Sequence, residues 1–438
     1  MSQITHARVL RIAAPVVLSN ATVPLLGAVD TAVVGQMGLA APIGAVGLGA
    51  MILATFYWVF GFLRMSTSGL AAQAHGAGDG VERSAILLRA LMVAGAAGLG
   101  LIVLQSLLFG AAFAIAPASE EVEGLARQYL SIRIWGAPAT VAIYALTGWL
   151  VGMERTRGVL WLQLVQNGLN VVLSVWFVLG LGWGVPGVAF ATLIAEYAGL
   201  LFALVLAREV FLADLGAALS RLWDRIALRR MFHASRDIML RSILLQLSFT
   251  AFLFLGARYG DVTLAANQVL LQFLEITAYS LDGFAIAAET LAGQALGARS
   301  LPQFRQASRL TMQWGLIGAG LISLVFLTFG PWLIDLMTTA PEVRTRAREL
   351  LPWLIAAPVI SFASWIYDGI FIGALMTREM LRTMALSVAI YAVALVVLMW
   401  VLGDHGLWAA LMVLNGARCL TMRAVFPAVL GRVSAAAA

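Results

Sequence analysis

The chain contains no lysine, and charged residues of any kind are scarce. Only 11% of its 438 residues are charged, and all of the side-chain basic charge at neutral pH comes from arginine. A soluble domain carries about a quarter charged residues. Together with 61% hydrophobic residues and a mean hydropathy of +0.92, this scarcity excludes an ordinary soluble protein. The composition indicates a chain that crosses a membrane repeatedly.

Cysteine is nearly absent as well. With Cys419 as the single cysteine, the sequence excludes an intramolecular disulfide and a cysteine metal cluster. Walker loops, HExxH and GxSxG are also missing, which argues against ATP-driven transport and against common hydrolase chemistry. We expect no enzyme activity, no cofactor, no bound metal and no nucleic-acid partner.

Apolar runs of about 20 residues recur between polar breaks, and this is the length that crosses a hydrocarbon core. The ten-residue alternation of a transmembrane barrel is missing. Since the backbone must satisfy its hydrogen bonds internally in lipid, we predict an all-α polytopic membrane protein. About twelve helices are expected, over 10–36, 45–73, 85–115, 125–152, 158–180, 185–207, 236–258, 264–290, 308–333, 348–375, 382–402 and 405–430.

Arginines collect in alternate loops, which predicts how the chain is oriented. The loops on one side carry Arg8, Arg11, Arg83, Arg155, Arg157, Arg221, Arg225, Arg229, Arg230, Arg236, Arg299, Arg305, Arg378, Arg382 and Arg432. The exception on the other side is a loop with Arg344, Arg346 and Arg348, partly offset by Glu342 and Glu349. We predict a multi-pass protein of a bacterial inner membrane, monomeric in the bilayer, with both termini in the cytoplasm.

The two halves of the chain repeat. Residues 70–77 (LAAQAHGA) reappear as 291–298 (LAGQALGA), an offset of 221 that also maps Gly148 and Gly152 onto Gly369 and Gly373. Six helices in each half make the repeat parallel, with an axis along the membrane normal. The predicted parts are an N-lobe over 1–207, a cytoplasmic linker over 208–235 and a C-lobe over 236–438.

Five segments carry a resemblance to a known family. They are Val29-Asp30-Thr31, Phe62-Leu63-Arg64-Met65-Ser66-Thr67, Arg236-Asp237-Ile238-Met239-Leu240-Arg241-Ser242, Ala278-Tyr279-Ser280-Leu281-Asp282-Gly283-Phe284-Ala285 and Asp368-Gly369-Ile370-Phe371-Ile372-Gly373-Ala374. The chain resembles multidrug and toxic compound extrusion (MATE) transporters, of the DNA-damage-inducible protein F branch. The resemblance implies export of organic, often cationic or amphipathic, compounds, driven by inward flow of H⁺ or Na⁺. It also implies two six-helix lobes around a V-shaped cleft.

Asp30 is the first candidate site residue, because it lies near the end of the apolar run 12–32. A carboxylate inside a membrane is costly and is by default a functional-site hypothesis. The resemblance matches Asp30 to the family's N-lobe coupling carboxylate, with Asn170 as its partner and Ser174 where an Asp is usual. Because Na⁺ prefers anionic oxygens, we expect H⁺ coupling, with Pro24 as the hinge at which protonation bends the helix.

Asp368 is the second candidate. The resemblance matches it to the C-lobe Asp of Na⁺-coupled relatives, which also carry a Glu where this chain has Leu245 and Gln246. We expect an incomplete Na⁺ site, with Asp368 still binding a cation or substrate.

Further charged residues lie inside the spans. Glu275 and Asp282 are seven residues apart and share a helix face, which predicts an acidic surface for cationic substrates or, alternatively, ion pairs with Arg241 or other basic groups. Arg64 and Glu196 are expected to pair with each other or with Asp30, or to contact substrate. The remaining substrate-site candidates are Asn167, with a plain interhelical hydrogen bond as its alternative, and Met65.

The leading hypothesis is therefore secondary antiport of drug-like small molecules against H⁺. Two alternatives share the fold: a Na⁺-coupled antiporter and a flippase for lipid-linked precursors. A flippase would need a strongly basic cleft, whereas the candidate charged residues inside the spans are mostly acidic. An intramembrane lipid enzyme would need clustered His or Asp motifs, which are missing from the sequence.

Overall fold

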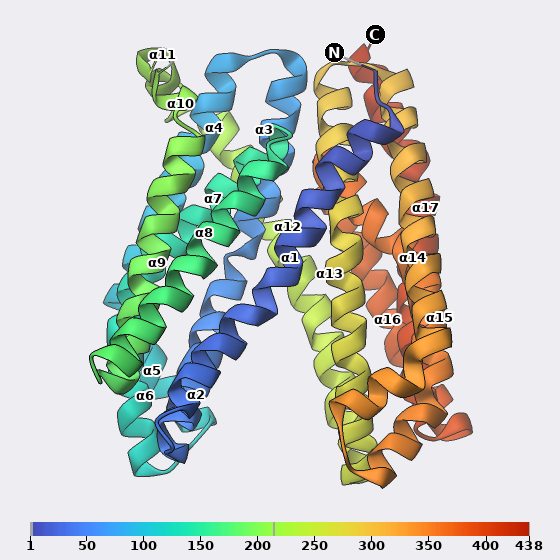
Figure 1. The fold of residues 1–438 in the computed structure, drawn as a ribbon. Coiled ribbons are helices and arrows are strands. Elements are labelled where there is room, and N and C mark those ends of the chain that lie inside the picture. Colours follow the sequence, from blue (N-terminus) through green and yellow to red (C-terminus); the bar gives the residue numbers. More distant parts are fainter. Residues whose placement is uncertain (1–2, 213–214, 438) are drawn as a thin grey trace. The chain divides into compact units, whose positions relative to one another are not determined.

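The computed structural model describes residues 3–212 and 215–437, with the backbone alone for residues 23–28 and 436–437. The described chain is almost entirely helical (Figure 1). In order the elements are α1 His6–Gly35, α2 Ala40–Val59, α3 Gly61–Ala77, α4 Gly80–Val103, α5 Gln105–Ile115, α6 Glu120–Arg133, η1 Ile134–Gly136, α7 Ala137–Gly152, α8 Thr156–Val175, η2 Trp176–Gly180, α9 Gly184–Leu206, α10 Glu209–Leu212, α11 Leu215–Ser220, α12 Arg225–Gly256, η3 Ala257–Tyr259, α13 Asp261–Gly297, α14 Leu301–Met337, α15 Pro341–Gly373, α16 Thr377–Leu402 and α17 His405–Ala437.

Within the described residues, 11 helical segments are long and apolar enough to cross a membrane. The 30-residue helix α1 is additional to that count. The prediction of an all-α polytopic membrane protein is therefore confirmed.

Three predicted helices are interrupted, which the hydropathy pattern did not reveal. The run 45–73 divides at Phe60 into α2 and α3, and the run 85–115 divides at Leu104 into α4 and α5. The run 125–152 divides at η1, and Pro138 stands in the first turn of α7, where its missing N–H costs nothing. Apolar composition continues through each break, so it predicts the span and not the break.

The described chain forms two compact units. The N-terminal unit comprises residues 18–75 and 79–231, and the C-terminal unit comprises residues 1–17, 76–78 and 232–438. These units differ from the predicted lobes in the first half of α1, which packs on α13: a Cβ on Gly283 would lie 2.7 Å from the carbonyl oxygen of Ala13. They differ again at α12, which begins at Arg225 and not near 236.

The repeat is visible as one helix contact made twice in the same register. In the N-terminal unit, Cβ atoms on Gly148 and Gly152 of α7 would lie 2.2 and 2.8 Å from the carbonyl oxygens of Arg64 and Ser68 on α3. In the C-terminal unit, Cβ atoms on Gly369 and Gly373 of α15 would lie 2.1 and 2.2 Å from the carbonyl oxygens of Ala285 and Glu289 on α13. The four positions of the second unit follow the first by the predicted offset of 221. Both contacts are small-xxx-small interfaces typical of membrane helices.

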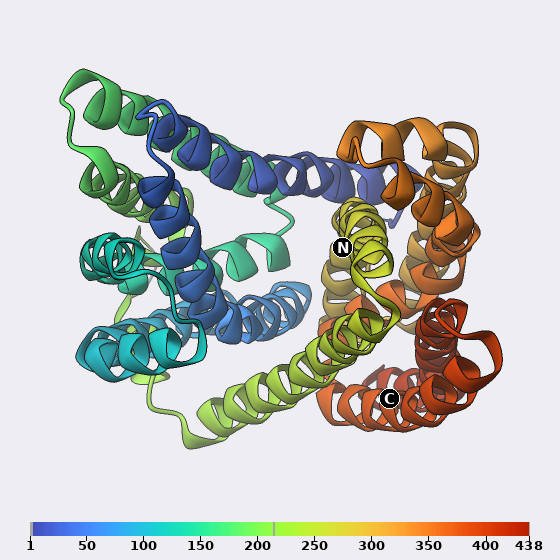
Figure 2. The ribbon, with the colours of Figure 1, turned by 90° about the horizontal axis from the view of Figure 1, so that it is seen from below.

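Helix α1 begins and α17 ends at the same end of the C-terminal unit (Figure 1), and Figure 2 shows α12 running obliquely along this unit. At the far end of this unit, the arginines expected in a loop that departed from the orientation rule lie instead in the first turns of α15, and they have counter-charges nearby. Arg348 lies 2.7 Å from Asp335, and Arg346 pairs with Asp404 and Glu349. The net positive charge of this segment is therefore lower than its arginine content suggests.

Candidate functional site

Asp30 lies in the interior of the N-terminal unit, near the end of α1, with 7% of its surface exposed. Ser174, in the last turn of α8, donates a hydrogen bond to Asp30 Oδ1 at 3.2 Å. Among the described residues, Asp30 forms no ion pair. Its direct hydrogen-bond partner is thus a neutral hydroxyl.

Asn170 lies one turn before Ser174 and is also buried. Its amide nitrogen donates to Thr192 Oγ1 on α9 at 2.8 Å, and Thr192 in turn donates to the carbonyl of Val188. Both Asn170 and Thr192 interact with the Asp30 carboxylate. The structure thus brings together the predicted trio of Asp30, Asn170 and Ser174 and adds Thr192.

This arrangement suits a group that changes its protonation state inside the protein. A buried carboxylate without a cation in direct contact is stabilised mainly by hydrogen bonds when charged, so its neutral and charged forms can come close in free energy. Hydroxyl and amide groups can serve either form, because a hydroxyl donates to the carboxylate and accepts from the acid. The cluster around Asp30 therefore has the donor and acceptor groups for taking up and releasing one proton.

Glu196, buried on α9, pairs with Arg133 at the end of α6 over 2.7 Å. The expectation that Glu196 pairs with Arg64 is therefore wrong. Arg64 forms no ion pair with Asp30 either, and its Nη1 is buried without a hydrogen-bond partner in the described part of the chain. A Cβ on Gly136 would lie 1.9 Å from Glu196 Oε2, so a larger residue at position 136 would displace the Glu196 carboxylate from its present position.

Arg133 is a residue that the sequence reasoning missed. Its Nε donates to Tyr129 Oη at 3.3 Å, and the Tyr57 hydroxyl donates to its carbonyl oxygen at 3.5 Å. It also acts on Asp30 through space. The sequence did contain a signal for Arg133, because it is a charged residue inside the predicted span 125–152, where a buried charge needs a partner.

Asp368 has quite different neighbours. It is buried on α15, and its Oδ2 accepts from Arg241 of α12 and, at 2.6 Å, from Arg418 of α17. Both arginines are buried, and Arg418 also donates to Asn415 at 3.1 Å. Two cations already occupy this carboxylate, so it is a poor ligand for Na⁺ or for a cationic substrate.

The acidic residues on α13 do not pair with Arg241, because Arg241 contacts Asp368. That part of the alternative is wrong, whereas pairing with another basic group stays a prediction. Glu275 and Tyr279 are exposed and Asp282 is partly exposed, and the phenol of Tyr279 lies within electrostatic reach of both carboxylates. An acidic pair around an aromatic ring is a favourable surface for an organic cation.

The remaining predicted residues have plainer positions. Asn167 donates to the carbonyl and hydroxyl oxygens of Thr22 on α1, at 3.3 and 3.2 Å, which is the interhelical hydrogen bond given as its alternative role. Met65 is half-buried on α3. Pro24 lies in α1 among the residues whose side chains are outside the described part of the chain, so its role as a hinge stays a prediction.

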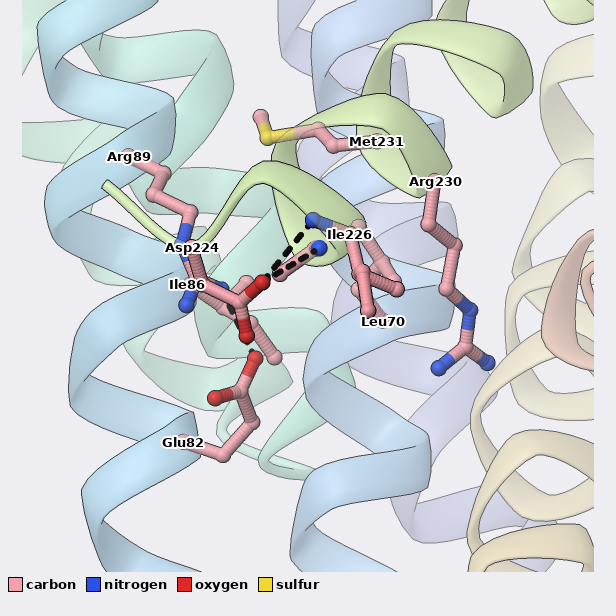
Figure 3. Close-up of a pocket in the computed structure, with 9 residues that line it drawn as sticks. Leu70, Glu82, Ile86, Arg89, Asp224, Ile226, Arg230 and Met231 are labelled. Atoms are coloured by element: carbon pink, nitrogen blue, oxygen red, sulfur yellow. Dashed lines mark hydrogen bonds and ion pairs between the residues drawn. The ribbon is translucent and has the colours of Figure 1, made fainter. Parts of the chain in front are cut away.

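A pocket of about 220 Å³ lies within the N-terminal unit, where the linker meets α3 and α4 (Figure 3). Arg89, 2% exposed, donates to Glu82 Oε1 and to the carbonyl of Arg221, both at 2.7 Å. Asp224 accepts from the amides of Ile226 and Ala227 and so caps α12. These contacts fasten the linker to the N-terminal unit, at a place separate from Asp30.

The comparison with protein families matches the MatE model over residues 15–176 and 238–404. These two stretches include Asp30, Asn170, Ser174 and Asp368, whereas Glu196 lies between them. The chain belongs to the MatE family.

Among curated proteins, this MatE chain is 42% identical over 416 residues to the DNA damage-inducible protein F of Escherichia coli K12, covering 95% of this chain and 90% of that protein. It is 32% identical to a probable multidrug resistance protein NorM of Deinococcus radiodurans, over 73% of this chain and 69% of that one.

Among solved structures, a MATE protein in its bent conformation matches with a TM-score of 0.85 at 18% identity, covering 98% of this chain and 95% of the other. A transporter from Pyrococcus furiosus matches with a TM-score of 0.82, again at 18% identity and over 98% of this chain and 96% of the other. At such identities the likeness concerns the fold, which agrees with the predicted MATE architecture.

Proposed function

We propose that this protein is a secondary active efflux transporter that exports organic cations or amphipathic compounds in exchange for H⁺. Membership of the MatE family supports transport, and the multidrug resistance name of the NorM relative supports drug-like substrates. In this proposal the chain works in a bacterial inner membrane with both termini in the cytoplasm, and protonation of Asp30 changes the bend of α1.

The observation that carries the proposal is the contrast between two buried aspartates. Asp368 lies between two guanidinium groups, whereas Asp30 accepts a hydrogen bond from the Ser174 hydroxyl and interacts with the neutral side chains of Thr192 and Asn170. Asp368 serves as the counter-ion of both arginines, so a change in its protonation would leave two buried guanidinium groups without a counter-charge. Among the described residues no cation contacts Asp30 directly, and Asp30 is therefore the coupling carboxylate in this proposal.

The same contrast favours H⁺ over Na⁺. A cation of this kind is held by several oxygens, preferably anionic ones. Asp30 itself supplies one carboxylate, and its described neighbours Ser174, Thr192 and Asn170 add two hydroxyls and one amide. Because no second carboxylate joins Asp30 there, a proton is the better exchange partner.

For the substrate, the exposed acidic surface of Glu275, Tyr279 and Asp282 favours organic cations over neutral compounds. The flippase alternative is favoured by no observation of comparable weight. It would require an extended basic surface for a polyphosphate, and the buried arginines found here each face a carboxylate.

The experiment is ethidium efflux from proteoliposomes under an imposed pH gradient and, separately, under a Na⁺ gradient at equal pH. We expect efflux with the pH gradient in the wild type and none in Asp30→Asn. Efflux driven by Na⁺ alone would select the Na⁺-coupled alternative. Efflux under neither gradient would remove antiport of this probe, and pH-driven efflux in Asp30→Asn would remove Asp30 as the coupling residue.

A further inference from the structure

The group formed by Arg241, Asp368 and Arg418 has more positive than negative charge in the interior of the C-terminal unit. Arginine stays protonated in proteins, so two guanidinium groups and one carboxylate leave one net positive charge. The exposed fractions are 7% for Arg241, 7% for Asp368 and 1% for Arg418. In the described part of the chain, no second carboxylate forms an ion pair with either arginine. A buried charge without a counter-ion is strongly disfavoured.

Hydrogen bonding in the group is also incomplete. Both arginines donate to the same atom, Asp368 Oδ2, while Asp368 Oδ1 has no partner among the described residues. The Nε atoms of Arg241 and Arg418 are buried and likewise lack an acceptor in that part of the chain. A saturated arginine–carboxylate pair uses two parallel bonds. The two Nε–H groups therefore lack acceptors, and one positive charge lacks a counter-ion, within the same group of residues.

We propose that Arg241 and Arg418 form a binding site for a monovalent anion, within the C-terminal unit and separate from the proton site at Asp30. The anion supplies the missing negative charge and accepts the free N–H groups. Asp368 occupies part of the same donor set and so acts as an internal competitor. The shared ligand chemistry is that of a carboxylate or a halide, because either neutralises one charge and accepts from a guanidinium fork.

The three charged side chains of this group are all largely shielded from solvent. The side chains of Arg241 and Asp368 retain 8% and 10% exposure, whereas that of Arg418 retains 1%. Asn415, one turn earlier on α17, holds the Arg418 guanidinium through its amide oxygen at 3.1 Å.

The test is equilibrium binding of radiolabelled chloride and of radiolabelled benzoate to the purified full chain, at constant ionic strength in a sulfonate buffer. We expect one saturable site. Arg241→Gln and Arg418→Gln should weaken it at least about tenfold, the loss typical of a charged hydrogen bond. Asp368→Asn should tighten it about threefold or more, because it removes the competing charge. Binding of benzoate that displaces chloride identifies a carboxylate site, and chloride alone identifies a halide site.

Arg258→Gln, which changes an exposed arginine on η3, is the matched control and should bind as the wild type does. Arg241→Lys keeps the positive charge but lacks the paired N–H donors of a guanidinium group, and it serves as a conservative variant in case Arg241→Gln does not fold. Size-exclusion chromatography checks that each variant is folded and monodisperse. Asp30→Asn should retain anion binding while losing proton-driven efflux, so failure of this proposal and failure of the proposed function are distinguishable. Equal affinity in wild type and Arg418→Gln, weaker binding in a monodisperse Asp368→Asn, or no saturable binding to the wild type would each overturn the site.

Discussion

At the residue scale, the position of a buried charge says less about its role than its neighbours do. Asp30 and Asp368 are equally buried, at 7% exposure each, yet a hydroxyl contacts one and two guanidinium groups contact the other. The sequence suggested Asp30 as a cation site because it interrupts an apolar helix, and the family resemblance suggested Asp368. The partners separated them.

Ser174 could be anticipated as a partner of Asp30 because it lies four residues from Asn170 and so shares a helix face with it. Arg133 and Arg418 could not. Their contacts with Glu196 and Asp368 join positions 63 and 50 residues apart on different helices, and no periodicity within a single helix constrains such a distance.

A first prediction concerns the buried pair of Glu196 and Arg133. Glu196→Gln leaves the Arg133 guanidinium without its counter-charge and should destabilise the protein by about 3–5 kcal/mol. The double variant Glu196→Gln with Arg133→Met should recover much of that loss, since it no longer buries a lone charge. Thermal unfolding in detergent measures both, and a double variant no more stable than Glu196→Gln would contradict the pairing.

At the element scale, the composition predicted spans well and their interiors poorly. The breaks at Phe60 and Leu104 fall within continuous apolar sequence. Apolar side chains suit the membrane interior equally well in one continuous helix and in two shorter helices. The glycine repeat was the more informative signal, because equal spacing in both halves required equal helix contacts. The structure confirms those contacts in both units.

A second prediction follows from the α3–α7 contact. Gly148→Ala places a methyl group 2.2 Å from a backbone oxygen that cannot rotate away, so α3 and α7 must separate. We expect a loss of about 1–3 kcal/mol in unfolding free energy. Gly100→Ala on α4 is the control: its Cβ would meet nothing within 4 Å, and alanine improves helix propensity. If both variants unfold alike, close packing of α3 on α7 is wrong.

A third prediction concerns Asp79, which precedes α4 and lies outside the spans. Partial burial acts to raise the pKa of Asp79, but the Glu82 amide and the Arg221 guanidinium outweigh it and hold that pKa below its ordinary value. A carboxylate with a lowered pKa stabilises the fold above the unfolded pKa of about 4, and the effect is lost as pH falls below it.

Hydrogen exchange of the amides that begin α4 measures this contact. Asp79→Ala loses the helix cap and the ion pair with Arg221, and at neutral pH it should exchange faster than Asp79→Asn, which loses mainly the charge. Below about pH 3, the wild type should approach Asp79→Asn once intrinsic rates are corrected. Identical exchange in all three proteins at neutral pH would show that Asp79 does not fasten the linker.

At the scale of the whole molecule, the two units share a scaffold and differ in their charges. Offset 221 superposes the glycine contacts but places Ala285 opposite Arg64, and Asp282 opposite Gly61. A duplicated fold with unequal ionisable groups can assign ion coupling to one unit and anion recognition to the other. A V-shaped cleft between the predicted lobes stays a prediction.

A fourth prediction separates the two roles. Lowering Na⁺ at fixed pH should leave ethidium transport within about twofold, because the groups around Asp30 lack a second anionic oxygen. Transport measured against Na⁺ concentration checks this. A steep Na⁺ requirement at constant pH would point to a cation site that includes other oxygens.

The most direct measurement of the central claim is proton release when ethidium is added to the purified protein in weakly buffered solution, followed with a pH indicator. The wild type should release protons saturably with ethidium, as a carboxylate that exchanges H⁺ for substrate must. Monodisperse Asp30→Asn should release none. Proton release of equal size from Asp30→Asn would contradict the assignment of coupling to Asp30.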